Sequence, residues 1–314
     1  MGIRYSSAAC RELGGLLRRI RDNAGLTAME VARKVGWPLT KISRMEHGWR
    51  TVTTTEVILY AVVCGLTLPE AEPLLELTRR AERKQGFYLS DERIGGSLQS
   101  LIFHESSAEH SIIYEPHLIH GLLQTPEYAR ARIRALNSSG VSEETVAGGV
   151  RTRMERRQVL NLSRFTIYIH EQALRFRVGN DRIMHEQLLH LVLTAALDNV
   201  TIRIVPSTAG RFGDAFHLMA FSEHQPIVYL DNLRFGGLIL EDPGYVNSYR
   251  EQVPMLAEVA LDAGQSREFA AELADAYDRG SWRVTADLAQ EQPQQRRGNQ
   301  LRGGGVVDPT PIYE

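Results

Sequence analysis

The sequence contains little that would support several common protein classes. Its 314 residues include only two cysteines, Cys10 and Cys64, which are too few for a disulfide framework and too far apart for a CxxC metal pair. No stretch approaches the roughly 20 apolar residues that a membrane helix needs, and the N-terminus lacks the apolar core of a signal peptide. We therefore expect a cytoplasmic protein with no membrane partner.

The short motifs of common enzyme active sites are also missing. There is no GxSxG, no P-loop, no HExxH and no glycine-rich dinucleotide turn. Four histidines, His104, His110, His117 and His120, lie within 17 residues, but only His117 and His120 are close enough in sequence to share a metal. Histidines scattered on loops are more often solvated than ligating. We predict a protein that is not an enzyme and that has no metal and no cofactor.

Charge is distributed unevenly along the chain. The formal net charge is −2, yet residues 1–53 hold ten Lys and Arg against four Asp and Glu, leaving 26 basic and 34 acidic residues in 54–314. A local charge of +6 followed by −8 indicates an N-terminal segment that binds a polyanion, attached to an acidic body. The length favours two domains.

The first eighty or so residues have the pattern of five short helices. Apolar residues from Leu13 to Ile20 repeat at the spacing of one helix face. Thr27 and Glu30 have the spacing of a capping box that starts a second helix, and Gly36 ends this helix in a turn that needs a positive φ. Pro38 suits the first turn of a third helix, a threonine cluster at 51–55 caps a fourth, and a fifth runs to about residue 84.

Two short helices joined by a glycine turn, inside such a bundle, can place the second helix in the major groove of DNA. Arg44 and Lys41 can donate to guanine, Leu39 can contact a thymine methyl, and Arg50 suits phosphate. The alternative is a helical hairpin with a solvated polar face. The predicted DNA-binding residues are Thr27, Ala28, Trp37, Pro38, Leu39, Thr40, Lys41, Ser43, Arg44 and Arg50.

The rest of the chain mixes strand and helix patterns. SIIYEP, FTIYIHE and VTIRIVP are typical of strands, and HLMAFS, PIVYL and GGLILE predict an antiparallel meander, followed by helices at about 243–262 and 266–280. We predict an α+β protein with a five-helix DNA-binding domain over 1–84, a linker over 85–97 and a mixed α/β domain over 98–282. Residues 283–314 are rich in Gln, Gly and Pro, and we expect them to be disordered.

A block in the larger domain is a candidate ligand or partner site, because polar residues lie next to a Leu-Leu turn and a basic helix follows. Alternatively, Gln124 and Thr125 cap the helix that begins at Pro126, and the arginines form a solvated face paired with acids such as Glu155. The predicted site residues are Tyr114, Glu115, Leu123, Gln124, Thr125, Tyr128, Arg153 and Arg157.

The segment LTAMEVARKVGWPLTKISRMEHG resembles the helix-turn-helix of the Cro/repressor (XRE) family. The matching positions are Leu26, Thr27, Val31, Ala32, Val35, Gly36, Ile42, Met45, Glu46 and Gly48. The resemblance implies a buried ion pair between Arg21 and Glu46. One departure is Ala28, which stands where the family usually has a glutamine that contacts phosphate.

Residues 98–280 resemble the C-terminal domain of actinobacterial regulators of the WhiJ-like, Scr1-type antitoxin-like group. The resemblance rests on YEPHLIHGLLQTPEYARA, VRTRMERRQVL, IHEQALRFRVG, QLLHLVLTA and NVTIRIVP, while His120 stands where that group commonly has Pro. It implies a transcription regulator controlled by a small protein encoded by a neighbouring gene. The alternatives are an antitoxin-like protein that acts mainly by binding such a partner, and a metabolite-responsive repressor.

We expect this regulator to bind double-stranded DNA as a homodimer. A single module of this size buries only about 600–1,000 Å² on DNA, and two half-sites one helical turn apart would supply the rest of the interface.

Overall fold

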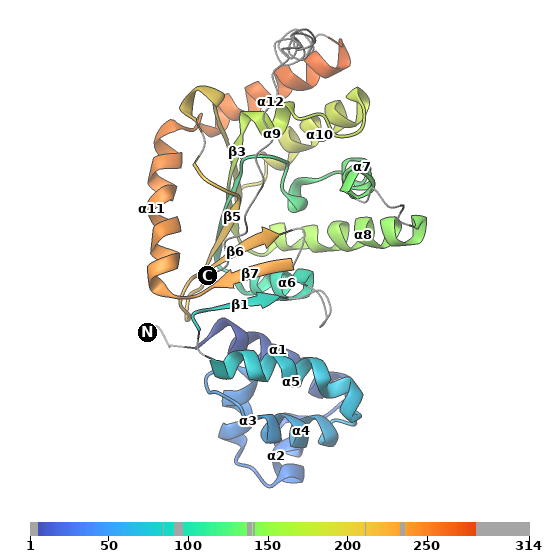
Figure 1. Cartoon of the computed structure of the whole chain (residues 1–314), viewed down its shortest axis with the longest axis vertical. Coiled ribbons are helices and arrows are strands. Elements are labelled where there is room, and N and C mark those ends of the chain that lie inside the picture. The colour runs from blue at the N-terminus through green and yellow to red at the C-terminus, as the bar shows by residue number, and fades with distance from the viewer. Residues whose placement is uncertain are drawn as a thin grey trace, which may run out of the picture.

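The protein is described from a computed structural model, which covers residues 6–83, 85–90, 97–136, 140, 142–210, 212–232 and 236–280. It has the predicted α+β architecture, with a helical N-terminal part packed against one end of a domain built on a single mixed sheet (Figure 1). The tail predicted over 283–314 lies outside the described residues.

The N-terminal part contains the five helices that the sequence predicts. Thr27 caps the second helix through a complete capping box with Glu30, and Gly36 ends that helix with a φ of 71°. Thr53 forms a second capping box with Glu56 at the start of the fourth helix. The five helices are α1 (Ala8–Asn23), α2 (Ala28–Val35), α3 (Leu39–Glu46), α4 (Thr54–Val63) and α5 (Leu68–Arg83).

Seven strands form the sheet, in the order β1-β7-β6-β5-β2-β3-β4. The predicted meander is confirmed, because β5, β6 and β7 pair antiparallel, whereas β2, β3 and β4 pair parallel. Strand β1 lies in the segment predicted as a linker, where it pairs with β7 and extends the sheet. The strands are β1 (Phe87–Ser90), β2 (His110–Glu115), β3 (Arg164–His170), β4 (Val200–Val205), β5 (Phe216–Ala220), β6 (Ile227–Asn232) and β7 (Gly236–Leu240).

Helices cover both faces of the sheet. One face packs on α11 (Pro243–Val259) through a core that includes Tyr114 and Phe216. The other face carries Ile113 and Phe165 and packs on the remaining helices of this domain (Figure 1). These helices are α6 (Ser97–Ser107), α7 (Pro126–Leu136), α8 (Glu143–Arg156), α9 (Glu171–Arg175), α10 (Asp181–Thr194) and α12 (Ala263–Asp278), with short 3-10 turns η2 (Gly121–Leu123), η3 (Arg157–Asn161) and η4 (Ser207–Ala209).

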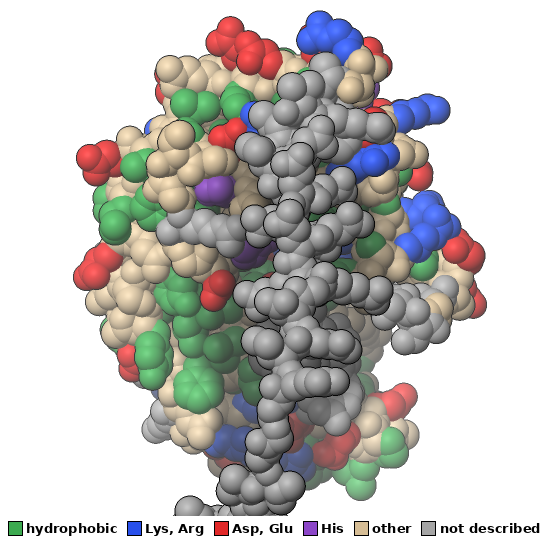
Figure 2. Space-filling model, turned by 45° about the horizontal axis from the view of Figure 1, so that its top comes forward, with side chains coloured by type: hydrophobic (Ala, Val, Ile, Leu, Met, Phe, Trp, Pro, Cys, Tyr) green, Lys and Arg blue, Asp and Glu red, His purple; other side chains and the backbone are tan. Residues whose placement is uncertain are grey.

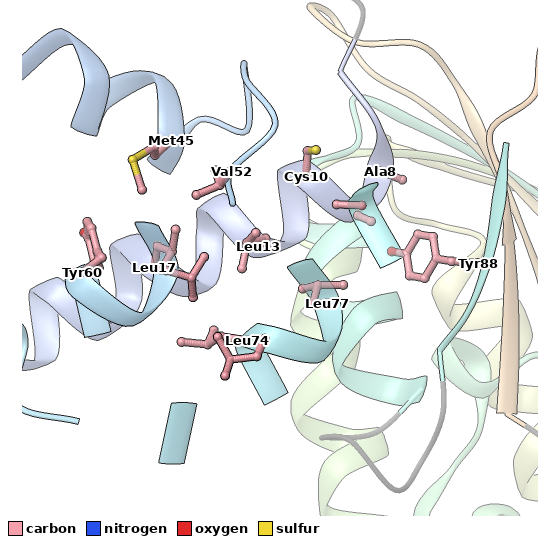
Figure 3. Close-up of a cluster of buried hydrophobic side chains, with 14 of the residues drawn as sticks. Ala8, Cys10, Leu13, Leu17, Met45, Val52, Tyr60, Leu74, Leu77 and Tyr88 are labelled. Atoms are coloured by element: carbon pink, nitrogen blue, oxygen red, sulfur yellow. The ribbon is translucent and has the colours of Figure 1, made fainter. Parts of the chain in front are cut away.

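The two parts of the chain share one buried core. Leu13 and Leu17 of α1 belong to the same cluster of buried side chains as Tyr88 of β1 and Ile239 of β7. Figure 3 shows Tyr88 pointing from the sheet toward Ala8 in the first turn of α1. Because separating the parts would expose this core, the helical bundle is held firmly on the sheet domain.

The outer surface is mixed in charge. On the face that Figure 2 presents, acidic side chains lie along both edges, basic side chains gather on the right and at the bottom, and hydrophobic side chains gather along the left part. Among the described residues, none of the helices combines the length and apolar character needed to cross a membrane.

Candidate nucleic-acid interface and its connection to the sheet domain

A buried ion pair fixes the end of the helix-turn-helix against α1. Arg21 Nε and Nη2 donate to the two carboxylate oxygens of Glu46 at 2.7 and 2.8 Å, and Tyr60 Oη donates to Glu46 Oε1 at 2.7 Å. Arg21 and Glu46 are each 8% exposed, so the pair that the family resemblance implied is present and deeply buried. Its hydrogen bonds hold α1 against the end of α3.

Close contact between α1 and the end of α3 depends on two glycines. A Cβ at Gly14 would lie 2.6 Å from the carbonyl oxygen of Met45, and one at Gly48 would lie 2.6 Å from Arg11 Cα. Gly48 also has a φ of 66°, a backbone conformation that residues with a Cβ rarely adopt. The motif predicted Gly48, whereas the need for glycine at position 14 appears only in the packing.

The first turns of α3 present side chains to the surroundings. Leu39 is 42% exposed, and Thr40 and Arg44 are exposed, while Ile42 and Met45 are fully buried under them. Among the described residues, Arg44 has no ion-pair partner. Its guanidinium is therefore available for a base edge or a phosphate.

Two other predicted DNA-binding cations share one carboxylate. Lys41 Nζ lies 2.8 Å from Glu56 Oε1 and 3.8 Å from the ring centroid of Trp37. Arg50 Nη2 donates to the Glu56 oxygens at 3.0 and 3.2 Å. Glu56 on α4, which the sequence analysis did not single out, therefore neutralises part of the positive charge beside α3.

The protonation of Glu56 reflects this arrangement. Burial on its own raises the pKa of this carboxyl, but the hydrogen bond from Lys41, the backbone N–H of Thr53 and the charge of Arg50 together outweigh burial and lower the pKa. Glu56 is ionised at neutral pH, and a DNA phosphate must compete with it for Lys41 and Arg50.

A buried polar network connects α1 to the sheet domain. Glu12 accepts hydrogen bonds from Tyr88 Oη at 2.7 Å and from Ser100 Oγ at 2.6 Å, and His104 Nε2 lies 3.0 Å from Tyr88 Oη. Nearby, Arg11 donates to the carbonyl oxygen of Gln225 at 3.3 Å. Ser100 and His104 belong to α6, so this helix contributes two of the polar side chains that meet the DNA-binding bundle.

Burial sets the protonation states in this network. It raises the pKa of Glu12, which the hydrogen bonds from Ser100 and Tyr88 partly oppose, and it holds the pKa of His104 well below its usual range. His104 is thus neutral and can donate its Nε2 proton to Tyr88, whose hydroxyl donates to Glu12. Nothing in the local sequence around these residues predicts their meeting.

The predicted ligand-site residues do not converge on one place. Tyr114 is fully buried against α11, and its hydroxyl accepts from the backbone N–H of Phe212 at 3.3 Å. Tyr128 and Leu123 are fully buried on the opposite face of the sheet. The period of two along a strand explains the separation, since Tyr114 and its neighbour Glu115 face opposite sides.

Several of the other predicted residues have internal partners. Gln124 is fully buried and donates to the carbonyl oxygen of Ile119 at 2.8 Å. Thr125 Oγ1 accepts from the N–H of Tyr128 at 3.3 Å, as a cap of α7. Arg157 Nη2 lies 2.6 Å from His190 Nε2. Thr125 therefore caps α7 as the alternative interpretation expected, whereas Gln124 bonds to Ile119 instead of capping this helix and Arg157 lies beside a histidine instead of an acid.

Glu115 and Arg153 belong to a cluster of ionisable groups beneath α8. Burial raises the pKa of Glu115 to about 8, although Arg132 and Arg156 oppose this shift. Burial also lowers the pKa of Arg153, and the neighbouring charges of Arg132 and Arg156 add to this effect. Glu115 and Arg153 therefore share the charges of Arg132 and Arg156 as neighbours.

The same region contains a group of possible metal ligands, although the sequence analysis predicted no metal. His120 lies with Glu105 and His217, and one ligand atom from each falls within 4.8 Å of the others. His117, which sequence spacing paired with His120, is exposed and outside this group. His120 lies against His217 of β5, so tertiary packing rather than sequence distance supplies its neighbours.

An exposed α3 on a bundle fixed by the Arg21–Glu46 pair defines a helix-turn-helix DNA-binding protein. Residues 12–74 match the family model described as a helix-turn-helix domain, which agrees with this assignment. Residues 98–272 match the domain of unknown function DUF5753, and since this match covers more than half of the 314 residues, the chain belongs to that family. No curated protein matches the chain.

Proposed function

We propose that the protein is a dimeric, sequence-specific transcription regulator that contacts operator DNA with α3 and is controlled through its sheet domain. The observation that carries the proposal is that Arg44 and Leu39 are exposed on α3, while Ile42 and Met45 on the opposite face of this helix are fully buried in the core. We further propose that it acts in the cytoplasm, has no catalytic activity and responds to a small protein encoded by a neighbouring gene, as regulators of the WhiJ-like, Scr1-type group would.

Control through the sheet domain is supported by the network at Glu12. Helix α6 contacts the DNA-binding bundle through Ser100 and His104, and the next residue, Glu105, is turned into the sheet domain, where it pairs with Arg156. A shift of α6 would therefore change the bundle and the domain interior together. Any effector or partner that binds one position of α6 better than another would bias DNA binding.

Fluorescence anisotropy with a duplex from the promoter of the protein's own gene tests the DNA-binding assignment. Arg44→Ala is expected to weaken binding by about 1–3 kcal/mol if the guanidinium contacts a base. Arg182→Ala is the matched control, because Arg182 is an exposed arginine on α10 that pairs with Glu186 at 2.9 Å. Equal affinities for the wild type and Arg44→Ala would contradict the assignment.

The dimer and the partner need separate measurements. Sedimentation of the protein with operator duplex is expected to give two chains per DNA, and a ratio of one would contradict the dimer. Co-expression with the small neighbouring protein is expected to yield a complex that changes operator affinity. If a complex forms but operator affinity stays the same, the antitoxin-like alternative is favoured over regulation.

A metabolite-responsive repressor is the second candidate function, and the buried ionisable cluster around Glu115 and Arg153 favours it. A thermal-shift screen of small molecules against the full chain tests it. A compound that raises the melting temperature and weakens operator binding would support this function, and a compound that does neither would not.

A further inference from the structure

We propose that Glu105, His120 and His217 form a binding site for one divalent transition-metal ion, with Zn²⁺ as the best fit. The three side chains come from α6, from the residue before η2, and from β5, and one potential ligand atom of each lies within 4.8 Å of the others. The site lies inside the DUF5753 domain, and its existence does not depend on DNA binding.

The strongest indication of a metal site is the buried ring of His217, whose nitrogens lack hydrogen bonds among the described residues. This side chain is 3% exposed, and among the described residues neither of its ring nitrogens has a hydrogen-bond partner. A buried polar atom without a partner costs about 1–3 kcal/mol, so it calls for an explanation such as a bound ion. Burial also lowers the pKa of His217 to about 4, which leaves the ring neutral and its lone pair available at pH 7.

The position of Glu105 relative to His217 fits a shared ion. Glu105 Oε1 lies 3.5 Å from His217 Nδ1. Two ligands of a tetrahedral zinc, each about 2.0–2.1 Å from the metal, are about 3.4 Å apart. An ion can therefore be accommodated between these two atoms with little movement of either side chain.

His120 supplies the third donor. Its ring lies at 88° to that of His217, with 5.8 Å between the ring centroids. Its Nδ1 accepts a long hydrogen bond of 3.4 Å from the N–H of Leu122. Metal binding would break this bond in either case. If Nδ1 binds the metal its lone pair is used, and if Nε2 binds the metal Nδ1 carries the ring proton and cannot accept. Burial holds the pKa of His120 well below its usual range, so this ring is also neutral.

Arg156 positions the carboxylate. Its Nε and Nη2 donate to the two oxygens of Glu105 at 2.7 and 2.6 Å, and both side chains are buried. Each carboxylate oxygen has two lone pairs, so Oε1 can accept from Arg156 and bind a cation at the same time. Such an outer hydrogen bond fixes the orientation of a metal-binding carboxylate.

The donor set selects the class of metal. Two imidazoles and one carboxylate suit Zn²⁺ and its transition-metal neighbours, whereas Mg²⁺ and Ca²⁺ prefer oxygen ligands throughout. Three protein ligands leave a coordination position open for water or an exogenous group.

Titration of Zn²⁺ into chelator-treated, full-length protein, in competition with a chromophoric chelator, tests the site. One Zn²⁺ per chain is expected, and Co²⁺ in its place is expected to give the intense visible bands of a four-coordinate site. His217→Leu is expected to lower the affinity by at least about 100-fold, since losing a ligand exceeds the 10–100-fold cost of losing an outer partner. Wild-type protein that binds no Zn²⁺ and no Co²⁺ would overturn the proposal.

Two further variants keep the test decisive. His120→Asn retains a side-chain oxygen that can cap η2 but removes the imidazole, so it should fold normally and still lose Zn²⁺ affinity. His117→Ala is the control, because His117 is exposed and outside the group, and it should bind Zn²⁺ as the wild type does. Loss of affinity in His117→Ala, with none in His120→Asn, would contradict the site. Zinc binding is measured without DNA, and operator binding is measured without zinc. A negative result for the metal site therefore does not affect the proposed DNA-binding function, and the reverse also holds.

Discussion

Two buried ion pairs, one in each part of the chain, have the same geometry but different surroundings. Arg21 holds Glu46 at 2.7 and 2.8 Å, and Arg156 holds Glu105 at 2.7 and 2.6 Å. Around Glu46, Tyr60 supplies a further donor. Around Glu105, the neighbour is His217, whose ring nitrogens lack hydrogen-bond partners among the described residues.

This difference separates a structural pair from a pair with unused binding capacity. A buried charged pair whose hydrogen bonds are completed orders the elements that carry it, and here it orders α1 and α3. A pair that adjoins neutral imidazoles retains lone pairs for a ligand. The four predictions that follow test this comparison, beginning with the largest expected effect.

Removing one partner of the structural pair should have the largest effect. Glu46→Ala leaves Arg21 Nε and Nη2 and the Tyr60 hydroxyl without their acceptor, while Asp22 still pairs with Nη1, so we expect a loss of about 3 kcal/mol of unfolding free energy. Urea unfolding followed by circular dichroism measures it. Glu72→Ala, which removes only an exposed pair with Arg79, should stay within about 0.5 kcal/mol of wild type. Equal effects of the two variants would contradict the structural role.

Cutting the connection between the two parts should have an intermediate effect. Tyr88→Phe removes the hydroxyl that donates to Glu12, so a buried carboxylate loses one of its donors, and we expect a loss of about 1–3 kcal/mol. Tyr245→Phe, at a residue that is 54% exposed, is the control and should be neutral. The same urea titration measures it. An unchanged unfolding free energy in Tyr88→Phe would mean that the contact between the helical bundle and the sheet domain does not depend on this network.

The unused capacity around Glu105 should be visible in the pH dependence of stability. The pKa of His217 is about 4 in the folded protein, below the 6.5 of an unperturbed histidine, so between these values the unfolded chain binds more protons. Its contribution to stability is therefore present above pH 6.5 and is lost as the pH falls toward 4. We expect the metal-free wild type to lose on the order of 1 kcal/mol more than His217→Leu between pH 6.5 and 5.

Unfolding in urea at the two pH values measures this difference, with His117→Gln as an exposed-histidine control. The sheet domain holds nine of the ten histidines, and the helical bundle holds only His47. The acid sensitivity should therefore belong to the sheet domain. An identical loss in the wild type and in His217→Leu would contradict this prediction.

The smallest effect is expected at the surface of the bundle. Glu56→Gln keeps the side-chain oxygen that caps α4 but removes the charge that pairs with Lys41 and Arg50. Freeing these cations should tighten binding to a non-specific duplex by roughly 0.2–1 kcal/mol, most clearly at low salt. Anisotropy at two salt concentrations measures it, and weaker binding by the variant would show that Glu56 positions the cations rather than competing for them.

Local signals in the sequence predicted most of the helical bundle. The Thr27–Glu30 capping box, the turn at Gly36 and the buried Ile42 and Met45 are features within one or two turns of chain, so a single sequence shows them. The strands of the sheet were also predicted, because their apolar runs are bounded by turn residues. Strand β1 was missed, since its four residues form a strand only by pairing with β7.

The candidate site in the sheet domain could be located only in part. The sequence analysis included Glu115 and Arg153, which share charged neighbours in Arg132 and Arg156, but it placed Tyr114 with Tyr128, which the sheet separates. His217 was not considered, because about a hundred residues separate it from its neighbours Glu105 and His120.

By itself, the sequence determined the helix-turn-helix, its caps and the residues of α3 that face outward, because helix formation and capping depend on neighbours a few positions apart. Only the tertiary structure decided that Glu12 meets Tyr88 and Ser100, that Glu56 neutralises Lys41 and Arg50, and that His217 lies beside Glu105. The physical reason is that strand register and helix packing fix those contacts, and both follow from burying apolar surface over the whole chain.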